Sequence, residues 1–166
     1  MRVGVLADTH DLLRPLVLER LAGCDLLLHA GDVGEVRSSG GGPGGGPSDD
    51  AEPILVRLAR LAPVLAVRGN VDGGALAAAL PAVRSGDLAG LPFRMTHRRE
   101  DVAPDWARQA RLIVFGHSHR PELEWQGDCL LLNPGSCGAR RFRLPLTVAV
   151  VTVAGDRLVP EILSVE

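Results

Sequence analysis

Two side chains that many enzymes use are missing from this chain. Its 166 residues contain no tyrosine, and all 18 basic residues are arginines because there is no lysine. Without lysine, the chain has no side-chain amine for Schiff-base chemistry and no P-loop lysine to hold a nucleotide phosphate. Without tyrosine, no phenol can act as an acid, a base or a nucleophile. These absences exclude several classes of covalent and phosphate-binding chemistry.

Cysteine and long apolar segments are also scarce. The three cysteines, Cys24, Cys129 and Cys137, are odd in number and match no metal-binding or disulfide pattern. This usage favours a reducing compartment, and we expect a cytoplasmic protein. The first apolar run meets Asp8 too early for a secretory signal peptide. No stretch reaches the roughly 18 apolar residues that a membrane span requires.

Length and charge predict a single globular domain over residues 1–166. The chain is 46% hydrophobic and 23% charged, which is ordinary for a folded domain. Its net charge of −2 gives no broad basic surface for nucleic acid or for an anionic membrane. The sequence leaves a homo-oligomer open.

One segment, 37–50, differs from the rest because it reads RSSGGGPGGGPSDD. Its glycine, proline and serine content predicts a flexible surface loop. The alternative is a glycine-rich cradle for phosphate. That alternative fails because the segment lacks the fixed glycine spacing and the lysine of such cradles.

The order of apolar runs and turns predicts the fold class. The first half alternates short apolar runs with helix-like stretches, which predicts a mostly parallel sheet covered on both faces. The second half contains turn-forming residues between apolar runs, which predicts antiparallel hairpins. Together they predict two packed sheets with helices outside. The expected elements are strands at 3–7, 26–30, 64–67 and from 112, helices at 12–22, 53–62 and 104–110, and hairpins about 89–90, 127–128 and 154–156.

Metal-binding side chains follow nearly every predicted strand. Four of the five histidines are among them, and all stand at or just beyond the carboxyl end of a strand, where ligands bind in open α/β sheets. Residues i and i+2 at a strand end point the same way, so such pairs can direct two donors at one point. The candidate ligands are Asp8, His10, Asp32, Asn70, His97, His117 and His119.

The residue types suggest which ions would bind. Asp32 is the natural shared ligand, because a carboxylate can bridge two cations through its two oxygens. Three oxygen donors and four imidazoles suit Mn, Fe, Zn, Co or Ni rather than Ca. Gly31, Gly69 and Gly116 allow the backbone to turn and to approach the site closely.

The candidate ligands lie in short motifs, which are DTH at 8–10, GD at 31–32, GN at 69–70, TH at 96–97 and GHSH at 116–119, and NPGS follows at 133–136. In this order, the motifs resemble those of the calcineurin-like metallophosphoesterases. The short length, the VRGNxD form and the NPGS motif are similar to the small YfcE-type phosphodiesterase subfamily, which is related to the vacuolar sorting protein Vps29. The resemblance runs from residue 2 to about 153.

The resemblance implies a two-sheet αββα sandwich and a specific ligand set. Asp8, His10 and His119 would hold one metal ion. Asn70, His97 and His117 would hold a second ion, and Asp32 would bridge the two. The implied cofactors are two divalent transition-metal ions. Manganese is the preferred candidate, and iron, zinc, nickel and cobalt are alternatives.

The implied activity is hydrolysis of a small phosphoester, most plainly a phosphodiester. A metal-bridging hydroxide would attack phosphorus in line, with Asp32, Asn70 and His97 as catalytic residues. The alternative function is a catalytically weak metal-binding scaffold or protein-interaction module on the same fold.

The sequence departs from the family at two places. Many members carry histidine or cysteine directly after the asparagine, where this chain has Val71, which cannot transfer a proton. The subfamily often reads HGH where this chain reads HRR, at 97–99. Both departures bear on substrate handling more than on the seven ligands.

Several further residues near the predicted site could have either of two roles. His29 is expected to be a buried histidine near the site rather than a ligand. Asp72 either orients a ligand or caps the following helix. NPGS is expected to be a turn that supports the site. The arginines Arg68, Arg98 and Arg99 either contact substrate phosphate or form surface ion pairs, and the second reading is favoured.

Overall fold

The computed structural model describes residues 1–34, 53–141 and 143–166 and contains two five-stranded sheets. The predicted loop at 37–50 lies outside the described residues. In spatial order, the first sheet consists of β10 (Arg157–Ser164), β9 (Thr147–Ala154), β1 (Arg2–Leu6), β2 (Leu26–His29) and β3 (Val64–Ala66). The second sheet consists of β4 (Val83–Leu88), β5 (Leu91–Thr96), β6 (Leu112–Val114), β8 (Cys129–Pro134) and β7 (Pro121–Gln126).

The helices in the described part of the chain are short. They are α1 (Pro15–Leu21), α2 (Ile54–Ala59), α3 (Gly74–Ala79), α4 (Trp106–Gln109) and a 3-10 turn at Arg99–Asp101. Apolar periodicity predicted longer helices at 12–22 and 53–62. The first begins later because the Leu12 N–H donates to the Thr9 carbonyl in a turn, and the helix starts only where Pro15 fixes a helical φ.

The first sheet is mixed rather than mostly parallel. β1, β2 and β3 pair in parallel, as the alternating pattern predicted. However, β9 pairs antiparallel with β1 and β10 pairs antiparallel with β9, so the carboxyl-terminal hairpin completes this sheet. All three predicted hairpins are present, as β4–β5, β7–β8 and β9–β10.

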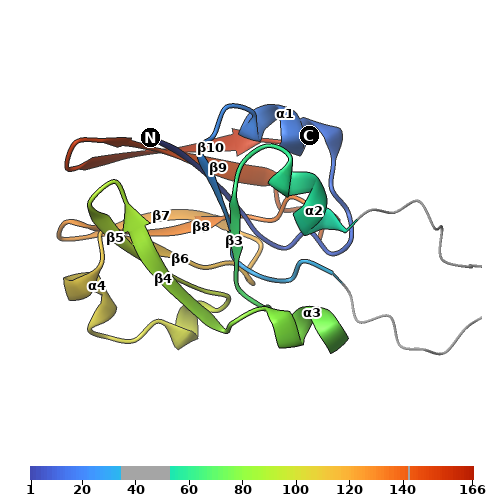
Figure 1. Ribbon diagram of the computed structural model, residues 1–166, viewed down its shortest axis with the longest axis horizontal. Helices are drawn as coiled ribbons and strands as arrows, with labels where there is room; N and C mark the ends of the chain where they lie inside the picture. Colours follow the sequence, from blue (N-terminus) through green and yellow to red (C-terminus); the bar gives the residue numbers. More distant parts are fainter. Residues whose placement is uncertain (35–52, 142) are drawn as a thin grey trace, which may run out of the picture.

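The predicted αββα layering is confirmed (Figure 1). Each interface between layers has its own apolar core. Between the sheets lie alternate residues of the central strands, such as Val5, Phe93 and Leu132. The other face of the first sheet packs against α1 and α2 through residues such as Leu21 and Leu58. The outer face of the second sheet is covered by α4, whose Trp106 packs in its own cluster. This burial on both faces explains why the central strands are continuous apolar runs.

None of the described helices is long and apolar enough to cross a membrane. The three cysteines are buried and free, which agrees with the absence of a disulfide pattern in the sequence.

Candidate metal centre

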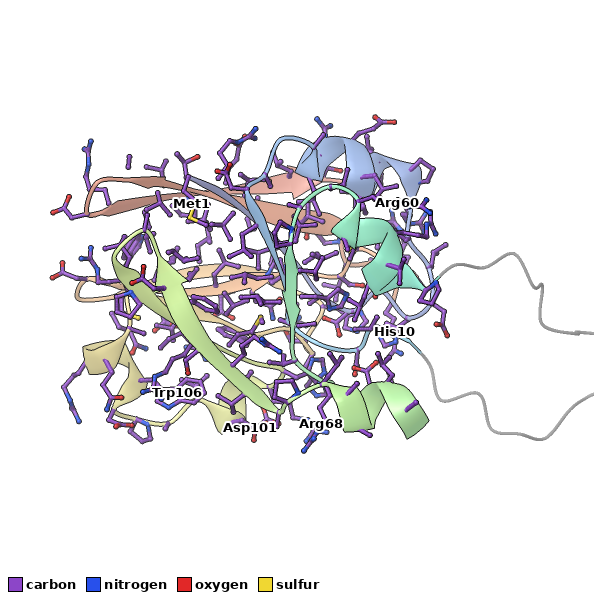
Figure 2. All side chains as sticks on the ribbon, viewed as in Figure 1. Met1, His10, Arg60, Arg68, Asp101 and Trp106 are labelled. Carbon is purple, nitrogen blue, oxygen red and sulfur yellow. The ribbon has the colours of Figure 1, made fainter. Side chains whose placement is uncertain are left out.

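The two sheets bring their donor-bearing strand ends together at one side of the molecule. Asp8, His10, Asp32 and Asn70 follow strands β1, β2 and β3 of the first sheet, and His97, His117 and His119 follow β5 and β6 of the second. Figure 2 shows His10 at this side, away from the hairpin turns at the opposite end. Because each sheet supplies part of the set, the candidate centre lies on the seam between them.

The first cluster is formed by Asp8, His10 and His119, all of which are buried. Asp8 Oδ1 lies 3.3 Å from His119 Nε2 and 3.9 Å from His10 Nε2. The two Nε2 atoms are 3.4 Å apart. Asp8 Oδ1 is buried and accepts no hydrogen bond from any described residue. A buried carboxylate oxygen facing two imidazole nitrogens is costly unless a cation lies among them, so this cluster fits a metal ion.

The second cluster is formed by Asp32, His97 and His117, with Asn70 beside it. His97 Nε2 lies 3.3 Å from Asp32 Oδ2 and 3.1 Å from Asn70 Oδ1. His97 Nδ1 donates to the Ala30 carbonyl at 2.7 Å, which leaves Nε2 as the nitrogen that faces the other donors. Metal-bound histidines are commonly oriented by such a bond to a backbone carbonyl. The donor set therefore also fits a metal ion.

Asp32 lies between the two clusters, but only one of its carboxylate oxygens faces both of them. Its Oδ2 is 3.9 Å from His10 Nε2 in the first cluster and 3.3 Å from His97 Nε2 in the second. Its Oδ1 accepts the Val71 N–H at 3.0 Å. From the sequence, each of the two oxygens was expected to bind one ion. The geometry instead presents Oδ2 alone to both clusters, because the backbone already uses Oδ1.

Local interactions keep Asp32 ionised. Burial alone would raise its pKa, but hydrogen bonds from His97 and from the Val71 N–H outweigh burial and lower the pKa to about 2. For His97, burial acts to lower the pKa, and the bonds to Asp32 and to the Ala30 carbonyl raise it overall. Burial lowers the pKa of His10, partly offset by Asp32. The site therefore holds a charged carboxylate at its centre at neutral pH.

The backbone at the site is unusual. Five of the seven predicted ligands have a positive φ, in the left-handed region that side-chain-bearing residues seldom adopt. Residues in such conformations cost of order 1–3 kcal/mol each and persist where the surroundings hold them. These five are Asp8, His10, Asp32, His117 and His119.

Asp72 holds the loops that carry the second cluster. Its carboxylate accepts backbone N–H groups from Asp32 at 3.1 Å, Gly34 at 3.0 Å and Gly69 at 2.7 Å. The helix that follows, α3, begins after Gly73 and has no side-chain cap. Of the two roles that the sequence allowed, Asp72 therefore orients the loops of the site rather than capping the helix.

The NPGS motif supports the ligands, as expected, but its Asn133 and Pro134 still belong to β8, and the chain turns only at Gly135, where φ is +80°. Asn133 Nδ2 donates to the Gly116 carbonyl at 2.8 Å, directly before His117. Ser136 Oγ donates to the Asp8 carbonyl at 3.0 Å. This turn therefore fixes the two ligand loops that come from different sheets.

His29 is fully buried beside the site, as expected of a supporting histidine. Its Nε2 lies 3.0 Å from Thr9 Oγ1, and the Gly31 N–H donates to its Nδ1. Burial lowers the pKa of His29 to about 4, so its imidazole is neutral at pH 7. Thr9 also donates to the Val33 carbonyl at 2.8 Å, which ties the loop after β1 to the loop after β2.

Sequence reasoning missed a close backbone approach at Gly138. A Cβ atom there would lie 2.0 Å from the Thr9 carbonyl oxygen and 2.8 Å from that of Asp8. The segment after NPGS therefore packs directly under the loop that carries Asp8 and His10. The only sequence signal for this was the glycine itself, two residues beyond Ser136.

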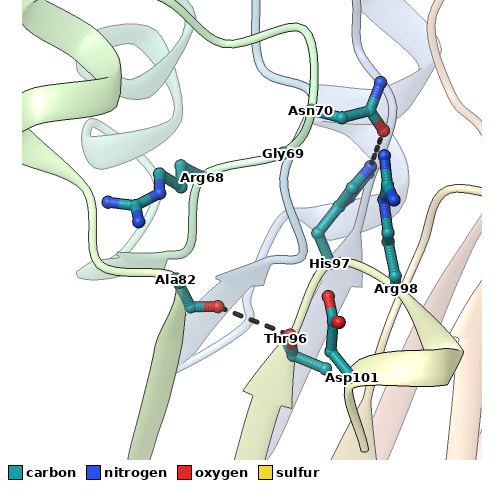
Figure 3. A pocket seen from close by; sticks show the side chains of 8 residues that line it. All are labelled: Arg68, Gly69, Asn70, Ala82, Thr96, His97, Arg98 and Asp101. Carbon is teal, nitrogen blue, oxygen red and sulfur yellow. Dashed lines mark hydrogen bonds between the residues drawn. The ribbon is translucent and has the colours of Figure 1, made fainter.

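An open cleft of about 160 Å³ adjoins the second cluster (Figure 3). Asn70 and His97 form one end of it, and Arg68, Arg98 and Asp101 are among its other lining residues. Among the candidate ligands, only Asn70 and His117 are exposed, and both belong to the second cluster. Among the described residues, the second cluster is therefore the more exposed of the two.

Comparison with known families identifies the class of protein that this fold and site define. Residues 1–156 match the model of the calcineurin-like phosphoesterase superfamily domain. The chain belongs to this superfamily, as its motifs indicated. A probable metallophosphoesterase from Methanothermobacter thermautotrophicus is 28% identical over 178 residues, covering 98% of this chain and 92% of the relative.

Solved structures show the same fold. A novel archaeal phosphodiesterase superposes with a TM-score of 0.73 at 20% identity, covering 98% of this chain and 100% of the other. The phosphoesterase YfcE from E. coli gives a TM-score of 0.64 at 22% identity, with complete coverage of both chains (100% each). Zinc-complexed Vps29 from Entamoeba histolytica gives 0.68 at 17% identity, with 99% of each chain covered. The predicted similarity to YfcE and Vps29 is confirmed at the level of fold.

Proposed function

We propose that the protein is a dinuclear metal-dependent phosphodiesterase that hydrolyses P–O bonds. The observation that carries the proposal is the position of Asp32 Oδ2, a single ionised oxygen that faces two separate donor clusters. The superfamily and the archaeal phosphodiesterase with the same fold support the choice of reaction.

In this proposal, Asp8, His10 and His119 hold one ion, Asn70, His97 and His117 hold the other, and Asp32 bridges them. Two divalent ions, manganese first, would supply an activated water molecule and would neutralise the charge on the phosphate oxygens. The chain itself keeps the ligands in place through Asp72, the NPGS turn and the His29–Thr9 contact. No protein nucleophile is required.

The proposal is tested by loading the protein with Mn²⁺ and measuring bound metal and hydrolysis of bis-nitrophenyl phosphate. We expect two ions per chain and activity that disappears in chelator and returns with metal. Less than one ion per chain, or full activity in chelator, would contradict the proposal.

The alternative is a metal-binding scaffold with little turnover. The replacement of a proton-transferring residue by Val71 favours this alternative, and Vps29 from Entamoeba histolytica has the same fold with zinc bound. Metal binding at full stoichiometry without hydrolysis of the activated diester would support the scaffold over the enzyme.

Val71 predicts a strong dependence on the leaving group. Its half-buried side chain can donate no proton, while its N–H is committed to Asp32. We therefore expect a steep fall in rate from nitrophenyl to alkyl leaving groups. Val71→His should recover about 10-fold or more on alkyl diesters, within the 10²–10⁴-fold typical of general acids, and little on nitrophenyl diesters.

The measurement is kcat for a series of diesters whose leaving groups differ in pKa, with the native protein and Val71→His in parallel. Equal rates across the series, with the chemical step shown to be rate-limiting, would mean that another group protonates the leaving oxygen.

A further inference from the structure

Arg98 gives the cleft beside the candidate metal centre a cation that the HGH pattern of the subfamily would not supply. It follows His97 directly, and both residues line the cleft. Figure 3 shows its side chain running alongside His97 toward the Asn70 end. The guanidinium group therefore lies on the side from which the second cluster is exposed.

Among the described residues, this guanidinium has one weak partner. Its ion pair with Glu100 spans 3.8 Å, and the two side chains are 41% and 62% exposed. Exposed pairs of this kind contribute little and are readily exchanged for another anion. Arg98 is thus available to a ligand in the cleft.

The two neighbouring arginines are placed differently. Arg99 pairs with both Glu122 and Glu124, so its guanidinium is already neutralised. This agrees with the surface ion pair that was favoured from the sequence. Arg68 lines the same cleft, but its side chain points away from Asn70 and His97 in Figure 3 and donates to the Leu80 carbonyl at 3.4 Å. Arg68 is therefore a matched control for Arg98.

Arg98 and Val71 together restrict the leaving group. Val71 cannot protonate a departing oxygen, and a guanidinium, which stays protonated in proteins, does not give up its proton either. A guanidinium does bind a phosphate through two parallel, charge-assisted hydrogen bonds. The leaving group that suits this pair is an oxyanion that needs no proton and already carries charge, and a second phosphate has both properties. Asp101, the carboxylate in the cleft, lies beside Thr96 rather than at the Asn70 end (Figure 3).

We propose that Arg98 binds the second phosphate of a phosphoric anhydride, so that the substrate class is P–O–P diesters such as dinucleoside diphosphates. This inference rests on the proposed hydrolytic function. In the reaction, the water oxygen forms a new bond to one phosphorus and the bond from that phosphorus to the bridging oxygen breaks. The electron pair stays on the bridging oxygen, which departs as part of the second phosphate without taking up a proton. The protons of the attacking water pass to solvent.

The test compares two substrates of the Mn²⁺-loaded protein. One is bis-nitrophenyl phosphate, which carries a single charged phosphate, and the other is two adenosines joined by a pyrophosphate. Arg98→Gln should lower kcat/KM for the anhydride about 10- to 100-fold, the range for losing hydrogen bonds to a charged group. It should change the nitrophenyl diester less than about threefold, and Arg98→Lys should retain part of the difference, because a lysine keeps the charge but loses the paired geometry. Arg68→Gln should affect the two substrates to the same extent and so should not discriminate between them.

Binding gives a second readout. A methylene-bridged dinucleoside analogue, which cannot be hydrolysed, should bind Arg98→Gln about 10-fold or more weakly than the native protein by calorimetry. Equal effects of Arg98→Gln on both substrates, unchanged analogue binding, or native activity on the nitrophenyl diester alone would overturn this inference and leave the proposed function standing. Metal-loaded protein that hydrolyses neither substrate would overturn the proposed function itself.

Discussion

Under the proposed function, replacing Asp32 with alanine should lower phosphodiester hydrolysis by about 10³-fold or more, beyond the roughly 10- to 100-fold that follows loss of a hydrogen-bond partner of a metal ligand. The reason is that Oδ2 of this one residue faces both donor clusters. Without it, two cations would approach each other with no negative charge between them. We expect bound Mn²⁺ to fall from two ions per chain to one or fewer.

The comparison variants are His119→Ala, which touches the first cluster only, and Asn70→Ala, which touches the second only. Each should be less damaging than Asp32→Ala and should retain one ion more readily. An Asp32→Ala protein with near-native turnover, alongside an inactive His119→Ala protein, would show that the bridge is assigned to the wrong residue.

Replacing Gly138 with alanine should impair both stability and activity, although its backbone needs no special φ. The added Cβ would meet the Thr9 carbonyl oxygen at 2.0 Å and its carbon at 2.5 Å, and neither is a flexible side chain. Overpacking of this kind costs roughly 2–3 kcal/mol. We expect the melting temperature to fall by about 5–10 °C. Because the loop that must shift carries Asp8 and His10, metal affinity should fall as well.

The control is Gly127→Ala, in the turn between β7 and β8. Nothing lies within 4 Å of a Cβ there, but φ is +59°, so the cost is conformational only, about 1–2 kcal/mol. Calorimetric melting and metal titration of both variants separate the two effects. Unaltered metal affinity in Gly138→Ala would show that the Asp8 loop does not depend on this contact.

The three hairpins could be predicted from the sequence because their signals are local, unlike the parallel pairings of β6 with β5 and β8 in the second sheet. A glycine-containing turn between two apolar runs determines a hairpin almost by itself, as at Gly127 and Gly155. The mixed first sheet was not predicted. The antiparallel neighbour of β1 is β9, so Val3 pairs with Val151, far along the chain. No local pattern at β1 indicates so distant a partner. Helix starts were misplaced for a related reason, since amphipathic periodicity marks a face and not a first turn.

The grouping of donors was predictable because strand ends meet at one edge of a sheet. The expectation that i and i+2 residues direct two donors at one point fits Asp8 and His10, whereas His117 and His119 belong to different clusters. The backbone at those donors was not predictable. Asp8, His10 and His117 have positive φ values against their intrinsic preference, held there by contacts from distant segments such as the NPGS turn. The use of one oxygen of Asp32 depends on a hydrogen bond from Val71, and the three amide contacts of Asp72 exist only once the loops are folded together.

The position of β1 has a consequence for synthesis on the ribosome. β1 lies between β2 and β9 in the first sheet, and every strand of the second sheet is made between β1 and β9. The second sheet is contiguous in sequence and can pair internally while β1 still lacks one neighbour, and such distant pairing is slow. Asp8 and His10, at the end of β1, gain their full support only when β9 emerges. On a nascent chain, the candidate centre would therefore be among the last parts of the molecule to take its final form.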